Sequence, residues 1–190
     1  FMRALKEAAS ILGMSLEELI NSTDIIRYST TIAMNTLLQR TGTKLGMIVT
    51  EGFEDTVEIG KAGRWADGLS IHEARNMARV IKPDPPIPRE MTVGVKERID
   101  SFGRIIRPLD EEDVLKKVQY LVDNGARGFV VSLLWSFANP VHERRIREII
   151  EHEYPDVYLG SMPVMLSSEI CPKAHEYTRT VTAMLNAYLH

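Results

Sequence analysis

The chain has 190 residues, of which 44% are hydrophobic and 26% charged, with a formal net charge of −3 and one cysteine. This composition is that of a folded globular protein and excludes collagen-like, low-complexity and disordered classes. No Lys/Arg cluster would follow a phosphate backbone, and no apolar run is long enough to span a bilayer. With a lone cysteine and no signal-peptide pattern, we expect a cytoplasmic protein that binds neither nucleic acid nor a membrane.

The first 80 residues are predicted to alternate between helices and strands. Two capping boxes, Ser15 with Glu18 and Ser70 with Glu73, mark helix starts, because serine and glutamate each accept a backbone N–H of the other. Apolar spacing sets the remaining boundaries. In chain order the predicted elements are helices over 5–12 and 16–20, a strand over 25–29, a helix over 31–39, a strand over 44–49 and a helix over 70–80.

The second half of the chain begins after a stiff connector over 83–88, where four prolines fix φ and exclude a helix. Residues 100–103 are predicted as the turn of a β-hairpin, because Gly103 can adopt the positive φ of a tight reversal. The elements predicted after the connector are strands over 91–99 and 104–107, a helix over 110–122, a strand over 128–135, a helix over 140–154, a strand over 157–159 and a helix from 173.

Strands joined through helices pair in parallel, because the chain must cross back over the sheet between them. We therefore predict an α/β fold with a parallel or mixed sheet, helices packed on it and one inserted β-hairpin. The proline connector would divide the domain over 1–190 into two sub-lobes, 1–82 and 89–190. Ligand sites in such folds gather at the carboxyl ends of the strands. The loops at those ends are 50–52, 136–139 and 167–169.

Hydroxyl groups gather where the strand predicted over 25–29 meets the following helix. Ser29, Thr30 and Thr31 lie at this junction, and Asn35 follows one turn later. Exposed backbone N–H groups and the positive end of the helix dipole suit a phosphate or a carboxylate. The alternative, which we favour, is that one threonine simply caps the helix.

Two further groups of residues each allow two interpretations. Arg179 lies in the first turns of the last predicted helix, where the dipole disfavours a cation, so it needs a partner such as Glu169 or a bound anion. Of these we favour a structural ion pair. A glycine-flanked loop carries Arg64, Trp65 and Asp67, and it fits a substrate loop and a subunit interface equally well.

Histidine and cysteine give no signal for a metal or a nucleophile. The five histidines are scattered and none falls in a His-Glu-x-x-His pattern, so no metal site is predicted. His142, which follows Asn139 and Pro140, is expected to be solvated rather than to face a cleft. Cys171 precedes Pro172 and is expected to be a small buried hydrophobe. Catalytic residues are therefore not assigned.

Segments distributed over nearly the whole chain carry a family resemblance. They are 29–40, 49–55, 58–60, 85–89, 97–100, 133–143, 176–180 and 185–188. On these segments the chain resembles the N-terminal part of the hydantoinase A/5-oxoprolinase family. Residues 63–68 and 131–137 resemble the acetone carboxylase β-subunit branch of that family more closely than the hydantoinases proper.

The resemblance implies an ATP-dependent enzyme with an actin/hexokinase-like, ribonuclease-H-like ATPase core. Such an enzyme uses ATP and Mg²⁺ to phosphorylate a carbonyl, amide or enol oxygen before carboxylation or ring opening. A small carbonyl or cyclic amide substrate and a hydantoinase B-like partner subunit are implied as well. The family's Asp-Val-Gly-Gly-Thr-Phe-Thr-Asp-like phosphate loop is missing from the sequence, so we expect a fragment that does not turn over ATP alone.

The favoured hypothesis is a fragment of an acetone-carboxylase-like β subunit that supplies part of a substrate and phosphate pocket. One alternative is an ATP-dependent N-methylhydantoinase or 5-oxoprolinase. Others are a non-catalytic lobe that docks a partner subunit and a stand-alone small-molecule-binding domain. By their positions in the loops, the residues assigned to the pocket are Thr30, Thr31, Asn35, Thr50, Glu51 and Arg179.

Overall fold

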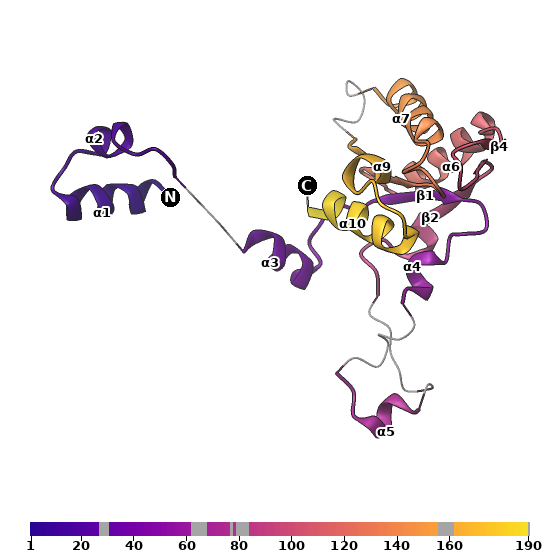
Figure 1. Ribbon diagram of the computed structural model, residues 1–190, viewed down its shortest axis with the longest axis horizontal. Helices are drawn as coiled ribbons and strands as arrows, with labels where there is room; N and C mark the ends of the chain where they lie inside the picture. Colours follow the sequence, from indigo (N-terminus) through magenta and orange to yellow (C-terminus); the bar gives the residue numbers. More distant parts are fainter. Residues whose placement is uncertain (27–30, 62–67, 77, 79–83, 156–161, 190) are drawn as a thin grey trace. The chain divides into compact units, whose positions relative to one another are not determined.

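The fold is seen in a computed structural model (Figure 1). The structure describes residues 1–26, 31–61, 68–76, 78, 84–155 and 162–189. They belong to two compact units, Phe1–Asn35 and Thr36–His190. Helix α3 (Ile32–Gln39), predicted over 31–39, begins in the first unit and ends in the second.

The first unit contains two short helices whose ends follow from local sequence. Helix α1 (Met2–Leu12) stops at Gly13, which has a φ of 68° that glycine takes without steric penalty. Helix α2 (Leu16–Asn21) begins with the predicted capping box, in which Ser15 and Glu18 each accept a backbone N–H of the other. Both helices therefore form where the sequence predicts them.

Four parallel strands form the centre of the second unit. Val49 lies opposite Gly94 on one neighbouring strand and opposite Ser132 on the other. The three strands that contain these residues are buried throughout, as expected for strands covered on both faces. In spatial order the strands are β2 (Thr92–Val95), β1 (Gly46–Thr50), β5 (Phe129–Ser132) and β6 (Val164–Leu166).

Helices cover the two faces of this sheet. The connections from β2 to β5 and from β5 to β6 cross the sheet in one direction, through α6 (Glu111–Asp123) and α7 (Val141–Glu153). The connection from β1 to β2 runs the other way and contains α4 (Thr56–Ile59). Because crossovers between parallel strands are right-handed, α6 and α7 lie on one face of the sheet and α4 lies on the other face (Figure 1). Helix α10 (Glu176–Leu189) contacts α4 and covers the same face as α4. The apolar core lies between these helices and the sheet.

An antiparallel hairpin of β3 (Arg98–Ile99) and β4 (Ile105–Arg107) forms a second, separate sheet. Its turn over 100–103 lies where predicted, with Gly103 at a φ of 78°. The predicted hairpin strand over 91–99 is wrong in part, because its first half pairs in parallel with β1 and only its end pairs with β4. The parallel sheet, its helices and the inserted hairpin confirm the α/β class.

Several other elements begin where the sequence predicts. Asp110 caps α6 by accepting the N–H of the residue three positions on. Ser70 and Glu73 form their capping box, but α5 (Ile71–Ala74) ends before the predicted limit at residue 80. Residues 75 and 76 are not helical, and residues 77, 79 and 80 lie outside the described residues. A 3-10 turn, η3 (Arg89–Met91), leads from the proline connector into β2.

The end of the sheet differs from the prediction. The strands predicted over 25–29 and 157–159 include residues outside the described ranges. Strand β6 is missed, because three residues after Pro163 show too little alternation to be recognised. It runs directly into α9 (Ser167–Ile170), a short helix where the prediction has a loop.

Candidate functional site at the carboxyl edge of the sheet

The strand order places a topological switch point between β1 and β5. From β1 the chain passes to β2 on one side, and it later enters β5 on the other side. Ligands of open α/β sheets bind outside the carboxyl ends of strands at such a point. Strands β1 and β5 end at Thr50 and Ser132, so this edge is the candidate site.

Three buried polar side chains, those of Thr50, Glu97 and His142, are bonded together at this edge. Thr50, 2% exposed, donates its hydroxyl to Glu97 Oε1 and accepts the N–H of Leu134 at 3.0 Å. The other carboxylate oxygen, Oε2, lies 2.8 Å from Nδ1 of His142 in the first turn of α7. A single carboxylate thus joins the segment after β2, the end of β1 and the start of α7.

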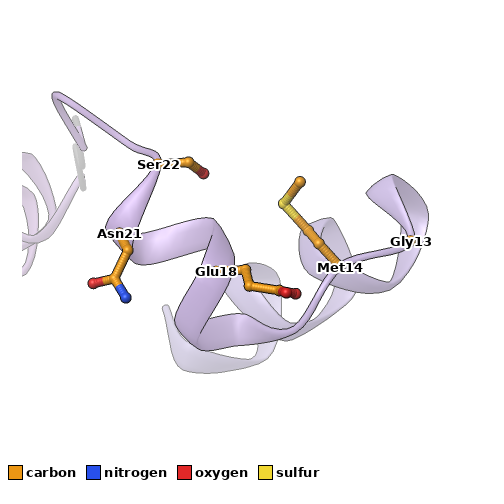
Figure 2. A pocket seen from close by; sticks show the side chains of 5 residues that line it. All are labelled: Gly13, Met14, Glu18, Asn21 and Ser22. Atoms are coloured by element: carbon orange, nitrogen blue, oxygen red, sulfur yellow. The ribbon is translucent and has the colours of Figure 1, made fainter.

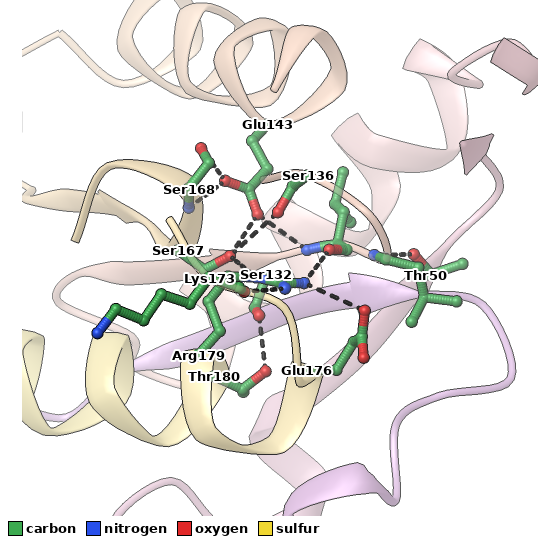
Figure 3. A network of polar contacts seen from close by, with 12 residues as sticks. Thr50, Ser132, Ser136, Glu143, Ser167, Ser168, Lys173, Glu176, Arg179 and Thr180 are labelled. Atoms are coloured by element: carbon green, nitrogen blue, oxygen red, sulfur yellow. Dashed lines mark hydrogen bonds and ion pairs between the residues drawn. The ribbon is translucent and has the colours of Figure 1, made fainter. Parts of the chain in front are cut away.

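Glu143, the next residue of α7, is fully buried and holds the neighbouring part of the edge (Figure 3). Its Oε1 accepts the N–H of Leu133 at 2.9 Å and the hydroxyl of Ser167 at 2.7 Å. Its Oε2 accepts the N–H and the hydroxyl of Ser168 at 3.0 and 2.6 Å. The four bonds fix the loop after β5 and the start of α9 to α7.

Arg179 of α10 is fully buried in the same network (Figure 3). Its guanidinium donates to Ser167 Oγ at 3.0 Å and to the carbonyls of Leu133 and Lys173 at 2.7 and 3.1 Å. The Glu176 carboxylate lies 3.8 Å away. Burial lowers the pKa of the guanidinium from its ordinary value, and the Glu176 charge opposes this shift.

The loop after β5 has an unusual backbone conformation. Trp135 is half-buried with a φ of 56°, which is rare for a bulky residue. Its ring centroid lies 5.7 Å from that of Phe137, and the Arg179 guanidinium lies 5.5 Å from the Phe137 centroid. Such conformations persist where surrounding contacts fix them, and they concentrate at functional sites.

Two predictions about single side chains are wrong. His142 is 5% exposed rather than solvated, because the first turn of α7 directs it inward to Glu97. Glu169 is not the partner of Arg179, because its carboxylate pairs with Arg147 at 2.8 and 3.0 Å. The structural ion pair expected for Arg179 is present, but with Glu176 at 3.8 Å. His142 and Glu169 each bond to a residue that is distant in the sequence, and such a partner cannot be identified from local sequence.

The residues predicted for the pocket lie in different places. Thr50 and Arg179 belong to the buried network and are bonded within the protein. Glu51 lies at the surface and pairs with Arg107 at 3.2 Å. Thr31 is exposed and belongs to the first unit, as does Asn35. The structure thus brings Thr50 and Arg179 into one network and leaves Glu51 outside it.

Other predicted residues fall outside the described part of the chain. They are Thr30 and the loop residues Arg64, Trp65 and Asp67. Cys171, expected to be buried, is half-buried at the end of α9.

Sequence reasoning missed Glu97 and Glu143 as site residues. Glutamate is ordinarily exposed, so the residue type gives no sign of burial. The available signal was position, because Glu97 follows directly after a strand and Glu143 lies in the first turn of a helix that starts at the carboxyl edge. Both also lie in segments that resemble the family.

The first unit has an open hollow of about 590 Å³ (Figure 2). Its charged side chain, Glu18, is already bonded to the N–H of Ser15 at 2.8 Å. The lining residues are Gly13, Met14, Glu18, Asn21 and Ser22.

The described ranges contain neither a metal-ligand cluster nor a membrane-spanning helix. In them, no group of three or more His, Cys, Asp or Glu side chains is placed to hold a metal ion. None of the helices that the structure describes is long and apolar enough to cross a membrane.

Comparison with known proteins identifies the family. The family model of the hydantoinase/oxoprolinase N-terminal region matches residues 1–154, so the chain belongs to this family, as the resemblance predicted. The acetophenone carboxylase gamma subunit of Aromatoleum aromaticum is 52% identical over 189 residues, which cover 100% of this chain and 26% of that protein. The acetone carboxylase beta subunit of Xanthobacter autotrophicus is 37% identical over 177 residues, 93% of this chain and 24% of that protein.

Solved structures agree with this assignment. Nucleotide-free acetone carboxylase matches with a TM-score of 0.88 and 33% identity over 97% of this chain and 26% of that one. The ATP-dependent caprolactamase of Pseudomonas jessenii matches with a TM-score of 0.78 and 31% identity over 98% of this chain and 26% of that one. The chain thus spans about a quarter of the length of these relatives. The two solved structures are described as those of ATP-dependent enzymes.

Proposed function

We propose that the chain is part of the ATP-dependent subunit of a ketone carboxylase. The observation that carries this proposal is the 52% identity to an acetophenone carboxylase subunit along the whole chain. The identity to a caprolactamase subunit over a similar length is 33%. This difference favours a ketone over a cyclic amide as the substrate.

In the proposed reaction, the ketone loses an α-proton and its oxygen attacks the γ-phosphorus of ATP. The bond between that phosphorus and the β,γ-bridging oxygen breaks, and ADP leaves. The product is an enol phosphate. Water then attacks its phosphorus, the bond between phosphorus and the enol oxygen breaks, and inorganic phosphate leaves. The α-carbon of the released enolate attacks the carbon of CO₂, which forms from bicarbonate by loss of hydroxide. Mg²⁺ would neutralise phosphate charge, although the described residues provide no cluster to which it can be assigned.

Two buried residues of the carboxyl edge support this reaction. Thr50 and Arg179 act from inside the protein by fixing the loop after β5. Thr50 accepts the N–H of Leu134, and Arg179 donates to the carbonyl of Leu133. We also propose that Arg64, Trp65 and Asp67, which lie outside the described residues, contact either the substrate or a hydantoinase B-like partner subunit. The residues proposed to contact substrate or phosphate are Thr30, Thr31, Asn35 and Glu51.

The test uses the complete subunit that contains this region, assembled with its partner subunits. We propose that this assembly is cytoplasmic. ADP formation is measured with acetophenone, acetone, caprolactam or 5-oxoproline, each with and without bicarbonate. We expect ADP formation to increase with a ketone and a carboxylated product to appear with bicarbonate. ADP formation that responds only to a cyclic amide would refute the proposal and support the lactamase or oxoprolinase alternative.

A further inference from the structure

The imidazole of His142 is held as a general base requires. Its Nδ1 lies 2.8 Å from the Glu97 carboxylate, which can only accept, so in the neutral ring the proton is on Nδ1 and the lone pair is on Nε2. Nε2 has no hydrogen-bond partner among the described residues. The residue as a whole is 5% exposed.

The position of this imidazole relates it to the candidate site. Glu97, which holds Nδ1, also accepts the hydroxyl of Thr50 at the carboxyl end of β1. Thr50 in turn accepts the N–H of Leu134 in the loop after β5. His142 is therefore joined through one carboxylate to the two strand ends that flank the switch point.

We propose that His142 is the general base that removes the α-proton of the ketone, and that Glu97 is its positioning residue. This inference rests on the proposed function. The C–H bond breaks, its electron pair forms the C=C bond of the enolate, and the carbonyl π pair moves to oxygen, which then attacks the γ-phosphorus. The proton is held on Nε2 of His142 and passes to solvent after ADP has left.

Glu97 has a second part in this step. The imidazolium formed by proton uptake lies against a carboxylate whose exposed fraction is only 3%. In the described part of the chain, no lysine or arginine pairs with Glu97, so its charge acts on the ring and on Thr50. Aspartate plays the corresponding part in hydrolase triads, where it fixes the tautomer and stabilises the imidazolium.

The test compares His142→Asn with His152→Asn in the complete, assembled enzyme. Asparagine can still donate to Glu97 from near the position of Nδ1, but it has no group that replaces Nε2. His152 is the matched control, because it lies exposed in the last turn of the same helix. Two rates are measured with acetophenone: ketone-dependent ADP formation, and deuterium uptake at the α-carbon in D₂O.

We expect His142→Asn to lower both rates by about 10²- to 10⁴-fold, the usual contribution of a general base, with an unchanged melting temperature. His152→Asn should behave as the wild type. A second variant, His142→Gly, should regain part of both rates when imidazole is added, because free imidazole can occupy the space of the lost ring.

Wild-type rates for His142→Asn would overturn the inference. If His142→Asn loses both stability and activity, the imidazole experiment with His142→Gly becomes the deciding measurement. Failure of added imidazole to restore the two rates of His142→Gly would also overturn the inference. Failure of the proposed function looks different, because the wild-type enzyme would then form no ADP in response to a ketone and would exchange no α-deuterium. In that case the general-base role falls together with the proposed substrate.

Discussion

Replacing Glu143 by glutamine should destabilise the chain strongly, although the two side chains have nearly the same shape. Each carboxylate oxygen accepts one backbone N–H, from Leu133 at 2.9 Å and from Ser168 at 3.0 Å. These donors cannot turn away, so the amide nitrogen of glutamine must face one of them and lose that bond. A hydrogen bond to a charged group contributes about 1.5–3 kcal/mol, and a buried N–H left unpaired costs a similar amount. The two costs partly describe the same loss and do not add in full, so we expect a total of about 2–4 kcal/mol.

This loss is measured by thermal unfolding of the 190-residue chain, followed by far-ultraviolet circular dichroism. At about 2–4 °C per kcal/mol for a chain of this size, the melting temperature should fall by roughly 5–15 °C. Glu151→Gln is the control, because this residue lies exposed on the same helix and should change stability by less than about 0.5 kcal/mol. A melting temperature for Glu143→Gln equal to that of the control would refute the reasoning.

Three further predictions use the same unfolding measurement. Gly94→Ala should lose about 1–3 kcal/mol, because its Cβ would lie 2.8 Å from the Cα of Glu51, and a wild-type midpoint would contradict this. Thr50→Val should lose about 1–3 kcal/mol by leaving two buried partners unsatisfied, whereas Thr50→Ser should restore most of it. Hydrogen bonds from Arg145 lower the pKa of the Glu111 carboxyl from its ordinary value of 4.5. The pair therefore stabilises the fold at pH values above 4.5, and this stabilisation is lost as the pH falls through the lowered pKa. Glu111→Gln should therefore match the wild type only in strong acid, and a constant difference would contradict this.

The parts of the fold that depend on local chemistry could be predicted from the sequence. The serine capping boxes and the Asp110 cap depend on residues three positions apart, so they are visible in a single sequence. The α/β class follows from the alternation of buried strands and helices. The split of residues 91–99 could not be predicted in this way, because parallel pairing of Gly94 with Val49 depends on distant segments.

The same distinction applies to the site. Thr50 and the neighbouring loops could be predicted because ligand sites in α/β folds lie at the carboxyl ends of strands, and these ends can be located from the predicted strands and helices alone. The partnership of Glu97 and His142 joins residues 45 positions apart, and neither residue type predicts burial. Only the folded arrangement shows that His142 is turned inward.

The central claim is that this region serves a subunit that activates a ketone with ATP, and a single-turnover measurement tests it most directly. The complete, assembled enzyme in excess over radiolabelled ATP is mixed with acetophenone in the absence of bicarbonate. If phosphoryl transfer to the ketone oxygen precedes carboxylation, ADP should form as soon as the ketone is added, at a rate well above that without ketone. ADP that forms at the same rate without the ketone, or only once bicarbonate or a cyclic amide is present, would contradict the claim.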